Sequence, residues 1–283
     1  MTTMSIRGVS LFAKVIGHGC PLVLMHGGPG LDHTSLWSLP ACADQFTLIF
    51  YDHRCNGRSE DAEQSTMTWE NLTEDADALR QTLGFEKWAV LGHSFGGMVA
   101  QEYALRYPQR VSHLILMDTC SDAWWVQENA AELLARRGYS EAAVQAVRRF
   151  YTSRLTPDEV TPTFMKFARA CFYHLSLFGT VHEMLFGHRA VRKSEATVFA
   201  HTQLLPGWTV MDRLNEIKAP TLVISGRQDF LFPPEHQAIL ADRLPNAQLV
   251  LIERAGHNPQ MERPVEVVRA VKRFMVTVNP GGA

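Results

Sequence analysis

The sequence predicts an α/β fold built on a mostly parallel sheet with helices on both faces. Short continuous apolar runs, such as Phe46–Tyr51 and Val111–Met117, are typical of strands that are buried on both sides. Amphipathic helical patterns separate these runs, which is the alternation expected when helical crossovers join parallel strands. Glycine-rich or polar clusters directly follow several runs, at the strand ends where such sheets place their sites.

Residues 1–120 are expected to supply the first part of this core. Strand-like runs at residues 10–16, 21–25, 46–51, 87–91 and 111–117 are bounded by turn residues. A helix is predicted after Thr68, whose hydroxyl can cap it, and this helix should end at Gly84. A further helix is predicted directly after Ser94, because apolar residues recur there at helical spacing.

The alternation breaks between residues 121 and 207, where helical patterns replace strand-like runs. Helices are predicted at residues 124–137, 140–151, 163–177 and 190–205. We therefore divide the chain into a first core segment, 1–120, a helical cap, 121–207, and a second core segment, 208–283. The cap is rich in aromatic residues, some expected to pack its helices and others to line a substrate pocket beneath it. They are Trp124, Trp125, Phe164, Phe167, Phe172 and Tyr173.

Strand-like runs resume in the last part of the chain, at residues 220–225 and 248–252. Each is followed by a helical pattern, at residues 234–244 and 264–275, so the α/β alternation continues. The tail, 279–283, is expected to be frayed.

Composition and charge are those of an ordinary globular protein. The 283 residues are 46% hydrophobic and 20% charged, with a formal net charge of −2. This net charge does not indicate a basic surface that would bind nucleic acid or an anionic membrane. No apolar stretch reaches the roughly 18 residues of a membrane span, and the N-terminus lacks the layout of a signal peptide. We expect a cytoplasmic protein with no nucleic-acid or membrane partner; composition leaves its oligomeric state open.

The cysteines point to the same compartment. Five are spread widely along the chain, without a CxxC pair. Their odd number and spacing indicate free thiols in a reducing cytoplasm, with neither a disulfide framework nor a zinc site. Cys55 lies in an expected loop, where a reactive thiol is the alternative to a structural one.

Residues 88–100, WAVLGHSFGGMVA, combine an apolar run, a glycine-flanked serine and the start of a helix. A strand that becomes a helix within a few residues needs a sharp turn, whose apex takes a rarely populated backbone conformation. Gly92 and Gly96 leave room across that turn, so Ser94 Oγ would stand clear of the backbone at a helix N-terminus. Ser94 is therefore the candidate nucleophile, and the alternative is an inert serine in a glycine-rich turn.

A serine hydroxyl needs an adjacent base, itself held by a third group, to act as a nucleophile near neutral pH. His257 follows the last strand-like run in a glycine-flanked loop, and Asp229 follows the preceding run. The order Ser94, Asp229, His257 is the one expected when a strand–turn–helix serine opens a catalytic triad. Asp118, at the end of its own strand, is the competing acid.

An oxyanion hole requires two N–H donors. The N–H of Phe95 is one candidate, and the glycine-rich loop HGGPG at residues 26–30 offers the other, for which Gly28 is favoured over the preceding glycine. His26 and His93 adjoin these turns and are expected to pack in loops. The loop lacks the patterns that bind phosphates or dinucleotides. Hydrolysis by acyl transfer through these residues would require neither a metal nor an organic cofactor.

With these residues in place, the sequence resembles the α/β hydrolase fold family over nearly its whole length. Within that family, HGGPG at 26–30 and DHRCNGRS at 52–59 are similar to motifs of the proline iminopeptidase branch, with Cys55 where that branch usually has glycine. The resemblance implies a helical cap after the sixth strand. It also implies Ser94 as nucleophile, Asp229 as orienting acid and His257 as base.

The chain departs from that branch at positions tied to peptide recognition. Phe95 follows the nucleophile, where iminopeptidases often have tryptophan or tyrosine, and their W-x-x-W-E pattern is missing. Such enzymes hold the free amino group of the substrate with glutamates in or near the cap. The predicted cap contains six glutamates, which are expected by default to face solvent: Glu128, Glu132, Glu141, Glu159, Glu183 and Glu195.

The predicted reaction is hydrolysis by acyl transfer through Ser94. The expected partner is a small peptide or amide with an N-terminal proline-like residue. The first alternative is a small ester or lactone, because the mechanism would be the same. The second alternative is a non-catalytic receptor that binds a small ligand in this fold.

Overall fold

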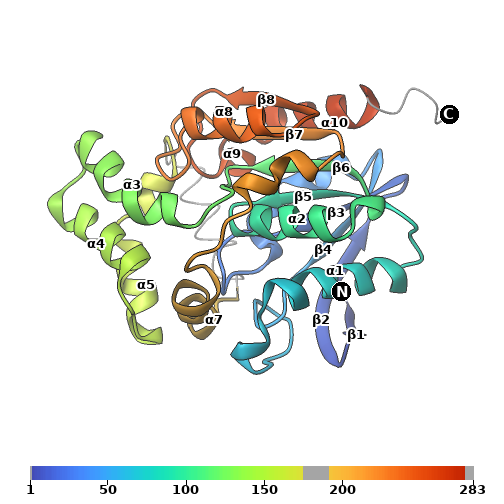
Figure 1. Ribbon diagram of the computed structural model, residues 1–283, viewed down its shortest axis with the longest axis horizontal. Coiled ribbons are helices and arrows are strands. Elements are labelled where there is room, and N and C mark those ends of the chain that lie inside the picture. The colour runs from blue at the N-terminus through green and yellow to red at the C-terminus, as the bar shows by residue number, and fades with distance from the viewer. Residues whose placement is uncertain (1, 175–190, 278–283) are drawn as a thin grey trace.

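The computed structural model describes residues 2–174 and 191–277. At its centre is an eight-stranded sheet in the order β1-β2-β4-β3-β5-β6-β7-β8 (Figure 1). The chain enters this sheet through an antiparallel hairpin, β1 (Thr2–Ile6) and β2 (Val9–Ile16), and β2 also pairs antiparallel with β4. The other strands run parallel: β3 (Cys20–Met25), β4 (Phe46–Tyr51), β5 (Trp88–His93), β6 (Val111–Met117), β7 (Thr221–Gly226) and β8 (Ala247–Ile252).

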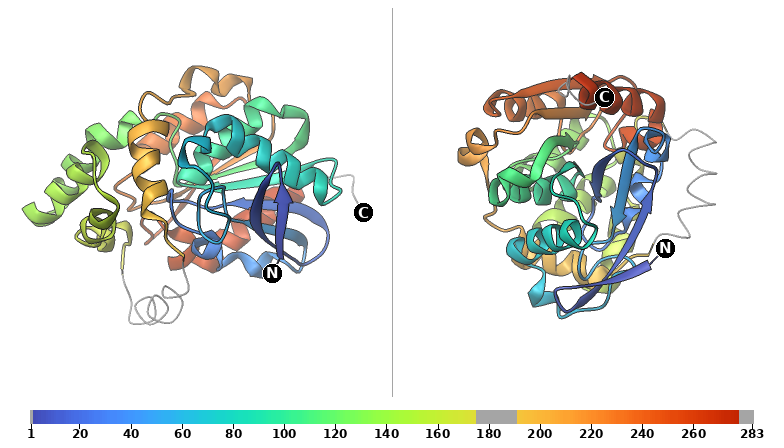
Figure 2. Two further views of the ribbon diagram at one scale, coloured as in Figure 1. Left: turned by 90° about the horizontal axis from the view of Figure 1, so that it is seen from below. Right: turned by 90° about the vertical axis from the view of Figure 1, so that its right-hand side faces the viewer.

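Helices cover both faces of the sheet (Figures 1 and 2). On one face lie α1 (Trp69–Thr82), α2 (Phe95–Arg106) and α8 (Pro234–Arg243). On the other lie α10 (Pro264–Thr277) and the 3₁₀ turns His33–Leu36 and Leu39–Cys42. The predicted α/β class, with a mostly parallel and doubly covered sheet, is confirmed.

The strands are apolar on both sides because each side packs against a separate core. In β3, Val23 and Met25 join the core beneath α1 and α2, while Leu22 and Leu24 join the core beneath α10. Successive side chains of a strand point to opposite faces, so a strand buried on both faces must be apolar at every position. This explains why the strands appear in the sequence as continuous apolar runs and not as alternating apolar and polar residues.

Local signals set the ends of α1. Thr68 accepts a hydrogen bond from the N–H of Asn71 at 3.1 Å, which caps the first turn. At the other end, Gly84 takes a φ of +78° and its N–H donates to Gln81 at 2.9 Å. Both ends agree with the sequence prediction.

Between β6 and β7 the chain leaves the sheet and forms helices at one end of the molecule (Figure 1). We refer to them as the cap helices: α3 (Trp124–Arg136), α4 (Glu141–Thr152), α5 (Pro157–Met165) and α7 (Ser194–Phe199), the last continued by a π-helical turn over Ala200–Leu204. A β-bridge between Asp122 and Thr209 joins the point where the chain leaves to the point where it returns.

The helix predicted at residues 163–177 is wrong. Helix α5 begins at Pro157, because Thr156 and Glu159 form a capping box and proline suits the first helical position. It ends at Met165 and is followed by a 3₁₀ turn over Ala168–Cys171. The end of the predicted helix, residues 175–177, and the tail, 279–283, lie outside the described residues. No helix within residues 2–174 or 191–277 is both long and apolar enough to cross a bilayer.

Candidate active site

Ser94 occupies the sharp turn between β5 and α2. Its backbone has a φ of +52° and a ψ of −120°, which non-glycine residues rarely adopt. The turn depends on its glycines: a Cβ on Gly92 would collide with the main chain of Gly96, and a Cβ on Gly96 would collide with the end of β3. The N–H of Ser94 donates to the carbonyl of Met117 at 3.0 Å, which ties the turn to β6.

His257 and Asp229 lie beside Ser94 beyond the carboxyl ends of the strands. His257 Nε2 is 3.0 Å from Ser94 Oγ, and His257 Nδ1 is 2.9 Å from Asp229 Oδ2. The other oxygen of Asp229 accepts a hydrogen bond from the N–H of Leu231 at 2.8 Å. An imidazole held between a hydroxyl and a carboxylate can take up the hydroxyl proton. The structure therefore brings together three residues that are far apart in the sequence.

The two other histidines near these turns hold loops in place. His93 Nε2 donates to the carbonyl of His257 at 2.9 Å, and burial lowers the pKa of His93 to about 3. His26 accepts a hydrogen bond from the N–H of His53 at 3.1 Å, and burial lowers the pKa of His26 too. Both rings are thus neutral near neutral pH, in the loop-packing role that the sequence predicted.

The glycine-rich loop at residues 26–30 lies against the Ser94 turn. A Cβ on Gly27 would lie 3.0 Å from the Cβ of Ser94, so only glycine lets the loop come this close. Gly28 has a φ of +63°, and none of the described residues accepts a hydrogen bond from its N–H. The N–H of Phe95 belongs to the first turn of α2, where N–H groups have no partner within the helix. Both groups are available to an acceptor on a bound molecule.

A buried charged network fixes the loop that follows Gly28. Asp52 accepts hydrogen bonds from the N–H and the ring of His33 at 2.8 and 2.7 Å, and from the N–H of Arg58 at 2.8 Å. Burial by itself would raise the pKa of Asp52, but the hydrogen bonds from His33 and Arg58 lower it. Asp32, His33 and Asp52 are close enough to hold a metal ion, yet both carboxylates already accept N–H groups of this loop. We therefore assign the cluster to loop positioning.

Two side chains that hold the loops of Asp229 and His257 against residues 121–207 had no sequence signal. Arg137, after α3, donates to the main-chain oxygens of residues 228–229 at 2.5 and 2.8 Å. Glu262, at the end of α9 (Pro259–Glu262), accepts hydrogen bonds from the N–H of Gly256 at 2.6 Å and from the N–H groups of residues 173–174 at 2.8 and 3.0 Å. No motif marks either side chain, because each role depends on which distant segments meet.

The aromatic residues predicted for the cap divide between different roles. Trp125 stacks on His236 of α8, with 4.3 Å between ring centroids, and so joins the cap helices to the core. Phe164 and Phe167 pack against Phe150 at 5.8 and 5.4 Å, inside the cap. Two others are largely exposed: Trp124 (56%) and Tyr173 (48%).

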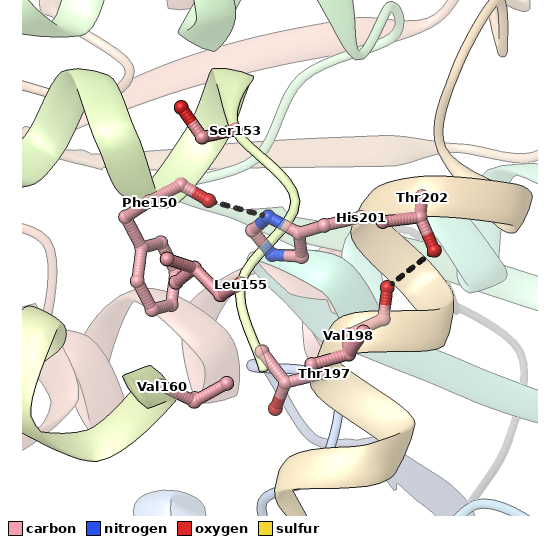
Figure 3. Close-up of a pocket in the computed structure, with 8 residues that line it drawn as sticks. All are labelled: Phe150, Ser153, Leu155, Val160, Thr197, Val198, His201 and Thr202. Carbon is pink, nitrogen blue, oxygen red and sulfur yellow. Dashed lines mark hydrogen bonds between the residues drawn. The ribbon is translucent and has the colours of Figure 1, made fainter. Parts of the chain in front are cut away.

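A small hollow lies inside the cap, between α4, α5 and α7 (Figure 3). His201 borders it and makes a 3.1 Å hydrogen bond with the carbonyl of Phe150, while burial lowers the pKa of His201 to about 4. The cavity volume is about 10 Å³, which is room for about one water molecule. None of the triad residues lines it, so it is a packing feature of the cap.

Cys55 is buried, which makes the reactive-thiol alternative wrong. Its Sγ donates to the carbonyl of Ala62 at 3.5 Å, and burial raises the pKa of the thiol. Its φ of +61° lies in the left-handed region, which explains why the related motif usually has glycine there. All five cysteines are free, and Cys20 is the exposed one.

The glutamates predicted for residues 121–207 are exposed or cap a helix where the structure describes them. Glu159 caps α5 by accepting the N–H of Thr156 at 2.9 Å. Four others are exposed: Glu128, Glu132, Glu141 and Glu195. Glu183 lies outside the described residues. The default solvent-facing role thus fits the glutamates whose positions are known.

Comparison with known proteins gives matches along most of the chain. Residues 21–264 match the alpha/beta hydrolase fold family. A relative, the proline iminopeptidase PfmaB of Pestalotiopsis fici, is 29% identical, with 96% of this chain and 98% of the relative covered.

Solved structures agree with this fold. The crystal structure of a proline iminopeptidase from Mycobacterium smegmatis has a TM-score of 0.77 at 23% identity, covering 98% of both chains. A thermophilic esterase from Thermogutta terrifontis has a TM-score of 0.67 at 27% identity, covering 98% of this chain and 97% of the esterase. From the match over residues 21–264, the chain belongs to the α/β hydrolase fold family, and it is similar to proline iminopeptidases.

Proposed function

We propose that the protein is a serine hydrolase that cleaves small substrates by acyl transfer. The observation that carries this proposal is the hydrogen-bonded chain from Ser94 Oγ through His257 to Asp229, with distances of 3.0 and 2.9 Å. His257 takes the hydroxyl proton as Ser94 attacks the substrate carbonyl, and gives it to the leaving group. Asp229 orients the imidazole and stabilises its charged form. Water then releases the acyl group through the same relay.

The N–H groups of Phe95 and Gly28 are proposed to bind the oxyanion that forms during this attack. Their support is the free first turn of α2, the approach of the glycine-rich loop to Ser94, and the positive end of the helix dipole at Ser94. The relay uses side chains and main-chain groups of this chain alone, without a metal or organic cofactor.

Residues 121–207 are proposed to form a cap that selects the substrate. Its support is the set of contacts from the cap region to the loops of the triad. Arg137 bonds the main chain beside Asp229, Glu262 ties the His257 loop to residues 173–174, and Trp125 stacks on α8. A change in the cap would therefore act directly on the loops that carry the acid and the base.

The first substrate class is a peptide or amide with a free N-terminal proline-like residue. The HGGPG loop and the similarity to proline iminopeptidases support it. The second class is a small ester or lactone. It is favoured by the cap glutamates that are described, because four are exposed and the fifth caps a helix. A free amino group would need a carboxylate partner in the pocket.

A matched substrate panel separates these classes. We expect proline p-nitroanilide to be hydrolysed and its N-acetyl derivative to be at least about 10-fold worse, since acetylation removes the charged amino group. Short p-nitrophenyl esters are assayed beside them, with Ser94→Ala as the background control. Ester turnover with no proline anilide turnover would make the peptidase assignment wrong. A protein that turns over neither substrate would favour the receptor alternative.

A further inference from the structure

Asp118 is a second buried carboxyl group beside the proposed acid. It follows β6 directly, is fully buried and has a φ of +42°. Its N–H donates to the carbonyl of Ile224 at 2.9 Å, and its Oδ1 accepts the N–H of Gly226 at 2.9 Å. Both bonds are to β7, whose end lies three residues before Asp229. The position of Asp118 is therefore fixed by the sheet itself.

The other oxygen of Asp118, Oδ2, has no N–H or O–H donor among the described residues. Asp229 is close enough for its side chain and its charge to act on the Asp118 carboxyl group. A buried carboxylate oxygen without a donor is unfavourable, and two neighbouring buried carboxylates repel each other. One proton removes both problems, because a neutral carboxyl group can donate its O–H to the other carboxylate.

The surrounding charges favour this protonation state. Burial raises the pKa of Asp118 well above its ordinary value, and the charges of Asp229 and Glu262 raise it further, against the opposing hydrogen bond from Gly226. Of the histidines near Asp229, His93 and His236 supply no compensating charge near neutral pH, because burial lowers the pKa of His93 to about 3 and that of His236 to about 4. Arg137 is a cation whose charge acts on Asp229, and its guanidinium also donates to main-chain oxygens of residues 228–229.

We propose that Asp118 is a positioning residue that keeps its proton and donates it in a hydrogen bond to the Asp229 carboxylate. The inference rests on the proposed function, in which Asp229 orients His257. Asp118 and Asp229 together then carry one negative charge. The hydrogen bond from Asp118 keeps that charge on Asp229, opposite Nδ1 of His257. The role of Asp118 is to set the basicity of Asp229 and, through it, of His257.

The test compares two substitutions that differ in their ability to donate. Asp118→Ala leaves Asp229 without this donor, so both Asp229 and His257 become more basic. We expect kcat/KM to fall about 10- to 100-fold, the range for a lost hydrogen bond to a charged group, and the acidic limb of the pH profile to move to higher pH. Asp118→Asn keeps an N–H donor for Asp229 and an oxygen that accepts the N–H of Gly226. Its kcat/KM and the acidic limb of its pH profile should therefore stay close to those of the wild type.

Asp122→Asn is the matched control, because Asp122 is also buried but accepts the N–H of Trp125 at 2.9 Å, away from the pair. Its pH profile should follow the wild type. If Asp118 is ionised in the native protein, Asp118→Asn instead removes a charge near His257 and moves the acidic limb to lower pH. That shift would overturn the proposal.

A second readout does not depend on activity. The infrared spectrum near neutral pH should contain the C=O stretch of a protonated carboxylic acid in the wild type and in Ser94→Ala, and this band should be missing in Asp118→Asn. If the wild-type spectrum lacks this band, Asp118 is not protonated and the proposal is wrong, even if the enzyme is active. A protein with the band but without hydrolytic activity keeps the pair and rejects the proposed function.

Discussion

Replacing Ser94 by alanine is expected to lower kcat by about 10⁴- to 10⁶-fold, because the side chain then has no oxygen that can bond the acyl group of the substrate. The residual rate would come from substrate binding and from the oxyanion donors alone. The fold should survive, since the Oγ of Ser94 bonds only His257 among the described residues while the main chain of the turn bonds β6. The measurement is kcat on the best substrate of the panel, with thermal unfolding as the control for folding.

His257→Ala and the double variant Ser94→Ala/His257→Ala complete this test. Residues that act as one unit lose most of the rate when the first is removed, so the double variant should be little worse than either single variant. Losses that multiply, or a Ser94→Ala variant within about 10-fold of the wild type, would show that the hydroxyl and the imidazole do not act together.

Asp229→Asn is expected to lower kcat by about 10⁴-fold while leaving the shape of the site intact. Besides the hydrogen bond proposed from Asp118, Asp229 accepts hydrogen bonds from Nδ1 of His257 and from the N–H of Leu231. An asparagine amide can replace only one of these acceptors, so it would favour the wrong tautomer of His257 and could not stabilise the imidazolium. The measurement is kcat between pH 6 and 9, where a loss due only to a shifted titration would be partly recovered.

Asp118→Asn is the matched comparison for this second prediction, because it makes the same chemical change in the neighbouring buried carboxyl group. It should retain far more activity than Asp229→Asn. The opposite ranking, with near-normal turnover in Asp229→Asn and a collapse in Asp118→Asn, would give the orienting role to Asp118.

Features governed by local physics could be predicted from the sequence. The strands followed from apolar runs, the start of α1 from Thr68, and the strained turn at Ser94 from glycines that only a close main-chain approach explains. The positions of His257 and Asp229 followed from one topological rule, that sites of parallel sheets lie beyond the carboxyl ends of the strands.

Features that depend on contacts between distant segments could not be predicted in this way. Arg137 reaches a carbonyl 91 residues further along the chain, and Glu262 reaches an N–H 89 residues before it. The burial of Cys55 and the influence of Asp229 on Asp118 likewise depend on how loops and strand ends meet. The start of α5, by contrast, had a local signal, the capping box from Thr156 to Glu159, which apolar spacing does not contain.

Covalent labelling with a fluorophosphonate probe tests most directly whether Ser94 is an activated nucleophile. The probe needs both a reactive hydroxyl and a base, and it needs no knowledge of the substrate. We expect one label per chain, found by peptide mass analysis on Ser94, absent in Ser94→Ala and much slower in His257→Ala. A folded wild-type protein that takes no label, or takes it at another residue, would contradict the account.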